Sequence, residues 1–205
     1  MATFATTAFL TLFVIVDPVG LTSLFLGVTN GYTKAHRRST ALRATLIAAA
    51  ILVTFLFVGG PLLEYLGVSI DALRIAGGLL LFKLAFDMVL GRRERATDSE
   101  EQEAHHRDDV AVFPLAIPLI AGPGAFATIL VLATEADQRP EFVAVLIGAL
   151  LVVLTLVYVG FRLAIPIQRL LGNTGTAVVT RVLGIILAAL AVQLVIDSVL
   201  AISRM

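Results

Sequence analysis

The chain contains six apolar segments, each long enough to cross a lipid bilayer as a helix. They cover residues 3–29, 40–65, 70–90, 110–134, 142–166 and 177–201. A helix rises about 1.5 Å per residue and the hydrocarbon core is about 30 Å thick, so about 20 apolar residues span it. With 59% hydrophobic residues and a mean hydropathy of +0.98, the chain has more apolar surface than a water-soluble domain usually buries. We therefore predict an all-α membrane protein with six transmembrane helices in one domain, residues 1–205.

The composition also excludes several classes of function. The formal net charge is zero, which gives no basic field for nucleic acid, and the absence of Cys excludes disulfides and thiolate chemistry. His36, His105 and His106 lie in predicted loops, and the sequence has no HExxH, GxSxG or phosphate-binding glycine motif. We therefore expect no enzyme activity, no cofactor and no resident metal. The longest polar stretch, residues 91–109, mixes both charge signs and predicts a solvated, disordered loop.

The distribution of Lys and Arg predicts the orientation in the membrane. Eleven of the fifteen lie in the first, third and fifth connections or beside them, three lie on the opposite side, and Lys83 lies within a span. Because cytoplasmic loops carry the excess of basic residues, both termini are expected outside the plasma (bacterial inner) membrane. No positive charge precedes the first apolar run, which favours a retained first span over a cleaved signal peptide.

The two halves of the chain resemble each other. The segment VDPVGLTSLFLGVT, residues 16–29, aligns with AGPGAFATILVLAT, residues 121–134, so that Pro18 matches Pro123. In the third span of each half, LRIAG matches TRVLG. Since each half has three spans, the second half is expected to sit upside down relative to the first, with repeats at about 1–90 and 110–205. Inverted repeats are a recurring transporter design, although duplication alone can also reflect ancestry.

The first and fourth spans are each interrupted at the matching position. One carries Asp17-Pro18-Val19-Gly20 and the other Ala121-Gly122-Pro123-Gly124. A Pro inside a helix removes a backbone hydrogen bond, and Gly lowers the helix propensity further. Because Pro favours the first turn of a helix, Pro18 and Pro123 should each begin a second half-helix. The N–H groups of residues 19–21 and 124–126 would then face the breaks unpaired, as sites suited to a carboxylate.

Asp17 is the most informative single residue, because a charge near the bilayer centre is costly unless it is paired, solvated or protonated. One interpretation is a helix N-cap that accepts from the following N–H groups. The other is a carboxylate that meets a substrate ammonium or carries a proton. These interpretations are compatible. Together with a carboxylate on the half-helix N-termini, the second describes a zwitterionic amino acid.

The candidate substrate-binding residues follow from the breaks and from the remaining polar groups in the spans. They are Asp17, Pro18, Val19, Gly20, Thr22, Ser23, Gly122, Pro123, Gly124, Ala125, Thr128 and Gln193. For the hydroxyl residues the alternative is a bond to their own helix backbone, and for Gln193 it is a link between helices. Lys83 is expected either to pair with Asp87, four residues later on the same helix face, or to extend toward the membrane surface, and Gly77-Gly78 to permit close helix packing.

The segments DPVG, LRIAGGLLL, PLAIPLIAGPGAFAT and TRVLGIILAALAVQLVID resemble the MarC family of integral membrane proteins over nearly the whole chain. The resemblance implies six spans, inverted repeats and broken first and fourth spans. The family is grouped with neutral amino acid transporters and is more distantly similar to LysE-type exporters. The chain departs from the family pattern at Leu21, Ser23 and Asp197, where members often have Asn, Pro and Asn.

The expected function is therefore transport of small neutral amino acids by alternating access, with export as a candidate direction and a proton as a candidate coupling ion. Two alternatives stay open. The first is a permease or channel for another small solute. The second is a membrane scaffold or stress-linked accessory protein without transport.

Overall fold

The structure is a computed structural model that describes residues 1–91, 109–136 and 139–203, and all secondary structure in these ranges is helical. The elements in chain order are α1 (Ala2–Val16), α2 (Pro18–Val28), α3 (Lys34–Tyr65), α4 (Ile70–Val89), η1 (Ala111–Ile120), α6 (Pro123–Glu135), α7 (Pro140–Arg162) and α8 (Ala164–Ile202). The prediction of an all-α protein is confirmed. The loop predicted at 91–109 lies outside the described residues except for Gly91 and Asp109.

Four helical stretches are long and apolar enough to cross a membrane: α1 with α2 (Ala2–Val28), α3, α7 and α8. A fifth forms if η1 and α6, which meet at a bend of 52°, are counted as one span. The sequence predicted six. The difference is α4, whose 20 residues include Asp71, Arg74, Lys83 and Asp87. Every 18-residue stretch of α4 contains at least three of these charges, whereas each of the other spans has an apolar stretch of that length with at most two.

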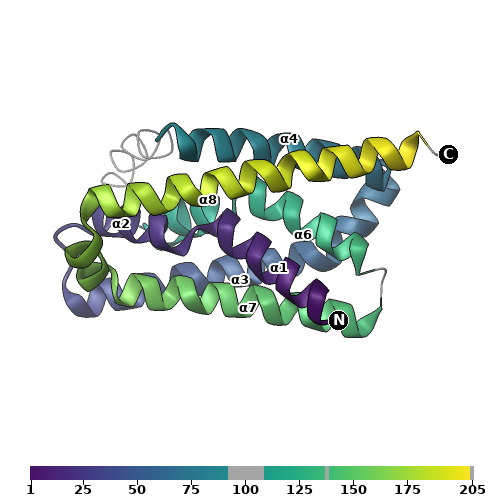
Figure 1. Ribbon diagram of the computed structural model, residues 1–205. Helices are drawn as coiled ribbons and strands as arrows, with labels where there is room; N and C mark the ends of the chain where they lie inside the picture. Colours follow the sequence, from purple (N-terminus) through teal and green to yellow (C-terminus); the bar gives the residue numbers. More distant parts are fainter. Residues whose placement is uncertain (92–108, 137–138, 204–205) are drawn as a thin grey trace.

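The helices form three layers (Figure 1). Helices α4 and α8 run side by side on one face, α3 and α7 lie on the opposite face, and the interrupted elements lie between them. Glycines allow α4 to pack closely, as predicted for Gly77-Gly78, with Gly78 against α8 and Gly77 against α6. A Cβ atom on Gly78 would lie 2.9 Å from the carbonyl oxygen of Ala191, and one on Gly184 would lie 2.9 Å from Cβ of Met88. Small residues of this kind allow helices to pack closely in lipid, where hydrophobic transfer does not drive their association.

The buried side chains fall into two clusters. The larger joins α1, α2, α3, η1, α6 and α7, and includes the stacked rings of Phe25 and Phe161 with centroids 4.3 Å apart. The smaller joins α4 and α8 to the end of α1 through Val14 and Ile15. The α4–α8 layer therefore has its own packing core and meets the rest of the protein next to the first break.

Two features shape α2 and α8, the helices that adjoin the first break. Arg37 in α3 caps the far end of α2, because its Nε donates to Thr29 Oγ1 (3.2 Å) and its Nη2 to the Thr29 carbonyl oxygen (3.1 Å). Helix α8 is kinked at Gly172, whose φ of 64° is left-handed and favours glycine. The kink sets a short initial segment, residues 164–171, at an angle to the long remainder of α8 (Figure 1).

Candidate functional site

The first break is a single residue in the left-handed conformation. Asp17, with φ 50° and ψ 69°, ends α1, and α2 begins at Pro18. The Pro ring disfavours right-handed helical geometry in the residue before it, and Asp is one of the few residues that tolerate the left-handed region. The prediction that Pro18 begins a half-helix is confirmed.

The Asp17 carboxylate is 1% exposed and accepts two hydrogen bonds. Its Oδ1 accepts from the Gly20 N–H at 3.0 Å, so the N-cap interpretation is confirmed. Its Oδ2 accepts from the Thr180 hydroxyl in α8 at 2.8 Å. A Cβ atom on Gly20 would lie 2.2 Å from Asp17 Oδ2 and 2.8 Å from Thr180 Oγ1, so this arrangement requires glycine at position 20.

Thr180 is the functional candidate that sequence reasoning missed. It stands at the start of TRVLG, the segment that aligns with LRIAG in the first half, and it is the one hydroxyl residue of that segment. A hydroxyl within a predicted span, in the segment that matches LRIAG of the first half, was the available signal. Which buried group it would bond could not be read from its position in the sequence.

The second break has a different construction. Element η1 is wound in wide turns, with Leu115 N–H donating to Val110 O (3.4 Å) and Ala121 N–H to Ala116 O (2.8 Å), five residues back in each case. Phe113 and Ile117 have extended backbone angles because each precedes a Pro. The first half of this span is therefore not a regular α-helix. Helix α6 begins at Pro123, as predicted, after Gly122 as its N-cap.

The expected unpaired N–H groups are only partly present. At the first break Gly20 donates to Asp17 Oδ1 and Leu21 to Asp17 O, and at the second Phe126 donates to Gly122 O. The expectation was wrong for these three groups, because residues at the cap position supply acceptors. Within the described ranges, the N–H groups of Val19, Gly124 and Ala125 have no acceptor, and α6 has no side-chain cap.

The tertiary structure brings the two breaks together. A Cβ atom on Gly124 would lie 3.4 Å from Cγ2 of Ile15, which is two residues before Asp17. The same position is 3.0 Å from Leu84 Cδ2 and 3.4 Å from Leu81 Cδ2 in α4. The start of α6 therefore faces the end of α1 and an apolar wall from α4.

The three predicted hydroxyl residues differ in their partners. The Thr22 hydroxyl donates to Val19 O at 2.7 Å, which confirms the backbone alternative for that residue. The Ser23 hydroxyl donates to Gln168 Oε1 in α8 at 3.0 Å. Thr128 is 2% exposed, and its Oγ1 is the buried side-chain polar atom in the described part of the chain that has no hydrogen-bond partner.

Gln193 does not join this group. Its Nε2 donates to Asp197 Oδ1 at 2.7 Å, and both side chains are exposed. Helix α8 turns Leu187 and Ala191 toward α4 and α1, which leaves Gln193 on another face. The predicted pair of Lys83 and Asp87 is confirmed, with 2.8 Å between Nζ and Oδ2.

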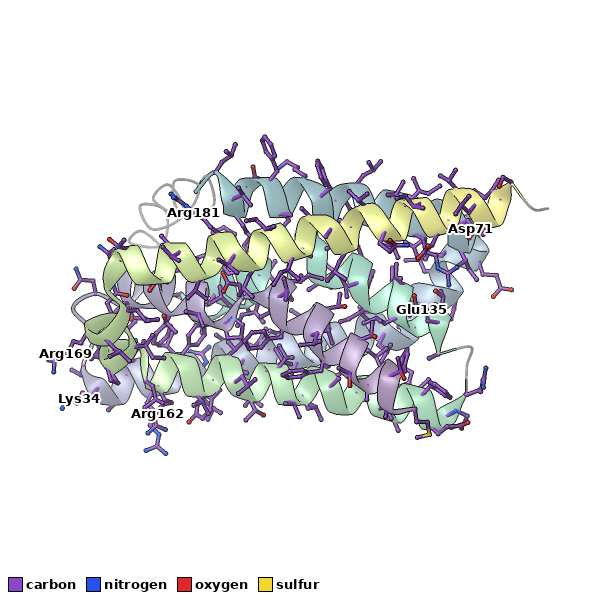
Figure 2. All side chains as sticks on the ribbon, in the orientation of Figure 1. Lys34, Asp71, Glu135, Arg162, Arg169 and Arg181 are labelled. Atoms are coloured by element: carbon purple, nitrogen blue, oxygen red, sulfur yellow. The ribbon has the colours of Figure 1, made fainter. Side chains whose placement is uncertain are left out.

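Charged side chains separate toward the two ends of the molecule (Figure 2). Lys34, Arg162 and Arg169 lie at one end, and Asp71 and Glu135 lie toward the other. The described chain therefore has an apolar middle between a basic end and an end with acidic residues. In this middle, no group of three or more His, Cys, Asp or Glu side chains among the described residues could hold a metal ion.

The family model for MarC family integral membrane proteins matches residues 2–203. The chain belongs to the MarC family. The resemblance inferred from its motifs is thus confirmed, and together with the apolar helices it establishes a multi-pass integral membrane protein.

Curated relatives of this MarC-family chain cover nearly its whole length. A UPF0056 membrane protein of Archaeoglobus fulgidus is 41% identical over 191 residues, which are 93% of this chain and 89% of the relative. UPF0056 membrane protein YvbG of Bacillus subtilis is 34% identical over 95% of this chain and 93% of its own length. UPF0056 membrane protein YhcE of Escherichia coli is 36% identical over 93% of this chain and 89% of its own length. These names describe membrane proteins and name no solute. No solved structure matches the chain.

Proposed function

We propose that this MarC-family protein transports a small solute, which binds where the two helix breaks meet. The observation that carries the proposal is the contact between the end of α1 and the start of α6 in the central layer of a membrane protein. Interrupted helices are tolerated at membrane depth where they are buried in protein or line a cavity, and paired breaks at matching positions are typical of transporter binding sites.

Part of the pattern of helix contacts supports an inverted-repeat architecture, which is common among transporters. Helix α2 contacts α7 and α8, and its counterpart α6 contacts α3 and α4. Likewise, α1 contacts α7, and its counterpart η1 contacts α3. Exchanging the two halves of the chain maps these contacts onto one another, whereas the contacts of α1 with α6 and α8 have no comparable counterpart from η1. In this proposal α4 is the sixth span, and its charges are tolerated because Lys83 pairs with Asp87 and Arg74 with Asp71.

The orientation follows from the two polar ends. Both termini lie at the end that carries Asp71 and Glu135, and Lys34, Arg162 and Arg169 lie at the other (Figures 1 and 2). In this proposal the protein lies in the plasma or inner membrane, and its basic end faces the cytoplasm.

Alternating access would arise from motion between layers that have separate packing cores. The α4–α8 layer has its own cluster of buried side chains, and the α3–α7 layer belongs to the larger cluster. The Asp17–Thr180 hydrogen bond joins the central layer to α8. Protonation of Asp17 would weaken its acceptor role at that junction, which makes a proton the candidate coupling ion.

The substrate that we propose is a small neutral amino acid. The free N–H groups of Gly124 and Ala125 suit a carboxylate, and Asp17 is the one carboxylate at the breaks that could meet an ammonium. Both oxygens of Asp17 already accept one hydrogen bond, so an ammonium would use their remaining lone pairs.

The test is uptake of labelled alanine, glycine and serine into proteoliposomes, with and without an inward proton gradient. Saturable uptake by the wild type that weakens in Asp17→Asn would support the proposal, and gradient dependence would identify the coupling ion. Empty liposomes are the control. No transport of these amino acids in either direction by folded protein would sink the amino acid proposal and favour another solute or a scaffold role.

A further inference from the structure

Two arginines from different helices meet at the hydroxyl of Tyr158, near the basic end of the molecule. Nη1 of Arg162, at the end of α7, donates to Tyr158 Oη at 3.0 Å, and the guanidinium carbon of Arg162 lies 5.8 Å from the centre of the ring. Arg38, in the second turn of α3, reaches the same hydroxyl as a hydrogen-bond donor. Two positive charges therefore converge on one tyrosine at the end where Figure 2 shows Lys34 and Arg162.

These two charges are not neutralised by the described side chains. Arg38 and Arg162 are both exposed, and the ion pairs of the described residues use other basic groups. Like charges that approach each other repel, and the repulsion is stronger near lipid than in bulk water. An anion that lies between the two guanidinium groups would remove that repulsion.

The stability of α3 does not explain why Arg38 stands where it does. The start of a helix carries a partial positive charge and favours acidic residues. Helix α3 has no acidic residue in its first turn, and Lys34, His36, Arg37 and Arg38 are among its first five residues. Arg37 has a structural role there, because it caps the end of α2. The contact of Arg38 with Tyr158 on another helix indicates a different role for this second arginine.

The chemistry of the three side chains is suited to a phosphate group. A guanidinium has five N–H donors and no acceptor, and a tyrosine oxygen that accepts a hydrogen bond keeps its own hydrogen for donation. Arginine binds phosphate with two parallel hydrogen bonds, which makes it well matched to this anion. Phosphate oxygens accept hydrogen bonds and carry negative charge, so a phosphate would satisfy the free donors of Arg38, Tyr158 and Arg162 together.

The position along the helices corresponds to the level of lipid headgroups. Arg38 is four residues after the start of α3, and Tyr158 is four residues before the end of α7. Each therefore lies about 6 Å from the end of its helix. Tyrosine and arginine are favoured at this depth, because their apolar parts lie in lipid and their polar ends reach the headgroups.

Apolar side chains continue from this site along the same two helices. On α3, Leu42 and Leu46 follow Arg38 at intervals of four residues and are 45% and 59% exposed. On α7, Leu151 lies seven residues before Tyr158 and is 47% exposed. Residues at these intervals share a helix face, and α3 and α7 contact each other. A molecule with its phosphate at the arginines would thus have an apolar surface beside it that fits acyl chains.

We propose that Arg38, Tyr158 and Arg162 bind the phosphate headgroup of an anionic phospholipid, whose acyl chains lie along α3 and α7. Basic sites between transmembrane helices at the cytoplasmic side are suited to such lipids, and the proposed orientation puts this site in the cytoplasmic leaflet. A zwitterionic lipid fits less well, because its ammonium group is repelled by the two guanidinium groups. The inference needs only a protein embedded in a membrane, so it stands or falls independently of transport.

The experiment measures lipid binding to the full chain, purified in a neutral detergent and freed of lipid. Native mass spectrometry gives the affinities for phosphatidylglycerol, which is anionic, and phosphatidylcholine, which is zwitterionic. We expect phosphatidylglycerol to bind about tenfold more tightly. Arg38→Gln and Arg162→Gln should each weaken phosphatidylglycerol binding by about tenfold, the effect of losing a hydrogen bond between charged groups.

Two further variants separate a specific site from a generally positive surface. Tyr158→Phe keeps every charge and removes one hydroxyl, and it should weaken phosphatidylglycerol binding by about fivefold. Arg169→Gln removes a positive charge at the same end of the molecule, outside the contacts of Tyr158, and should keep the preference for phosphatidylglycerol. All four variants should melt as the wild type does without added lipid, which excludes misfolding as the cause of weaker binding.

Equal binding of the two lipids, or unchanged phosphatidylglycerol binding in both Arg38→Gln and Arg162→Gln, would overturn the inference. So would a loss in Arg169→Gln as large as in Arg38→Gln with none in Tyr158→Phe, because that pattern describes a diffuse positive surface. Inorganic phosphate is the remaining probe. If it displaces phosphatidylglycerol at an equal concentration, the site takes free phosphate and the assignment to a lipid is wrong.

Discussion

The Thr180 hydroxyl in α8 donates a 2.8 Å hydrogen bond to Oδ2 of Asp17, 163 residues earlier in the chain. The bond ties the central interrupted span to the α4–α8 layer, and both residues are buried. The other oxygen of the same carboxylate caps α2 through Gly20. One side chain therefore stabilises a local helix start and a contact between layers.

Removing the Thr180 hydroxyl should destabilise the fold at this junction. We expect Thr180→Val to lower the free energy of unfolding by about 1–3 kcal/mol, because it leaves a buried carboxylate oxygen without its partner. Unfolding in a detergent titration measures the change. Thr180→Ser should retain most of the stability, and Thr176→Val, which removes a hydroxyl bonded within α8 at Gly172 O, is the control. Identical unfolding of Thr180→Val and the wild type would contradict the role assigned to this bond.

Gly20 should tolerate no side chain. We expect Gly20→Ala to cost about 2 kcal/mol or more, because the new Cβ would lie 2.2 Å from Asp17 Oδ2 and force the carboxylate out of its position. Gly60→Ala in α3 is the matched control, since a Cβ there meets nothing within 4 Å. The control should be neutral or more stable by up to about 1 kcal/mol from its higher helix propensity. Thermal unfolding of both variants gives the comparison, and equal effects would refute the steric explanation.

Asp17→Asn should separate the charge of Asp17 from its structural role. Asn is as good an N-cap as Asp and tolerates the left-handed conformation. We therefore expect this variant to fold with a stability within about 1 kcal/mol of the wild type while losing most of its solute uptake. Asp17→Leu, which removes the cap as well, should unfold more readily than Asp17→Asn. If Asp17→Asn transports at the wild-type rate, the negative charge of Asp17 has no part in transport.

Single cysteine variants should reveal the orientation, because the natural chain contains no Cys. Tyr65 is 88% exposed at the end of α3, and Leu170 is 85% exposed between Arg169 and the α8 kink. A membrane-impermeant maleimide added to intact cells should label Tyr65→Cys but not Leu170→Cys. Permeabilised cells should label both. Labelling of Leu170→Cys in intact cells would reverse the proposed topology.

Several features could be predicted because they depend on neighbours in the sequence. The helix breaks before Pro18 and Pro123 follow from the missing N–H and the ring of Pro. The Lys83–Asp87 pair follows from a spacing of four residues on one helix. The alternative roles of Thr22 as a self-bonded hydroxyl and Asp17 as an N-cap were likewise local possibilities.

Other features could not be predicted because they depend on how helices rotate and pack. Element η1 has wide turns around Pro114 and Pro118, which the local sequence alone did not indicate. Gln193 was placed at the site from its polarity, but α8 turns it outward toward Asp197. The bond between Ser23 and Gln168 joins residues 145 positions apart in the chain.

The sequence by itself determined the membrane class and the two interruption points, because apolar length, Pro geometry and capping act over a few neighbouring residues. It did not determine where every helix begins, since α3 begins at Lys34 and α8 at Ala164, ahead of the predicted apolar segments. The tertiary structure alone decided that Thr180 meets Asp17, that Ile15 meets Gly124, and that Thr128 stays without a partner. These contacts join residues far apart in the chain. They are selected by which helix faces pack together, and a local sequence pattern does not specify that packing.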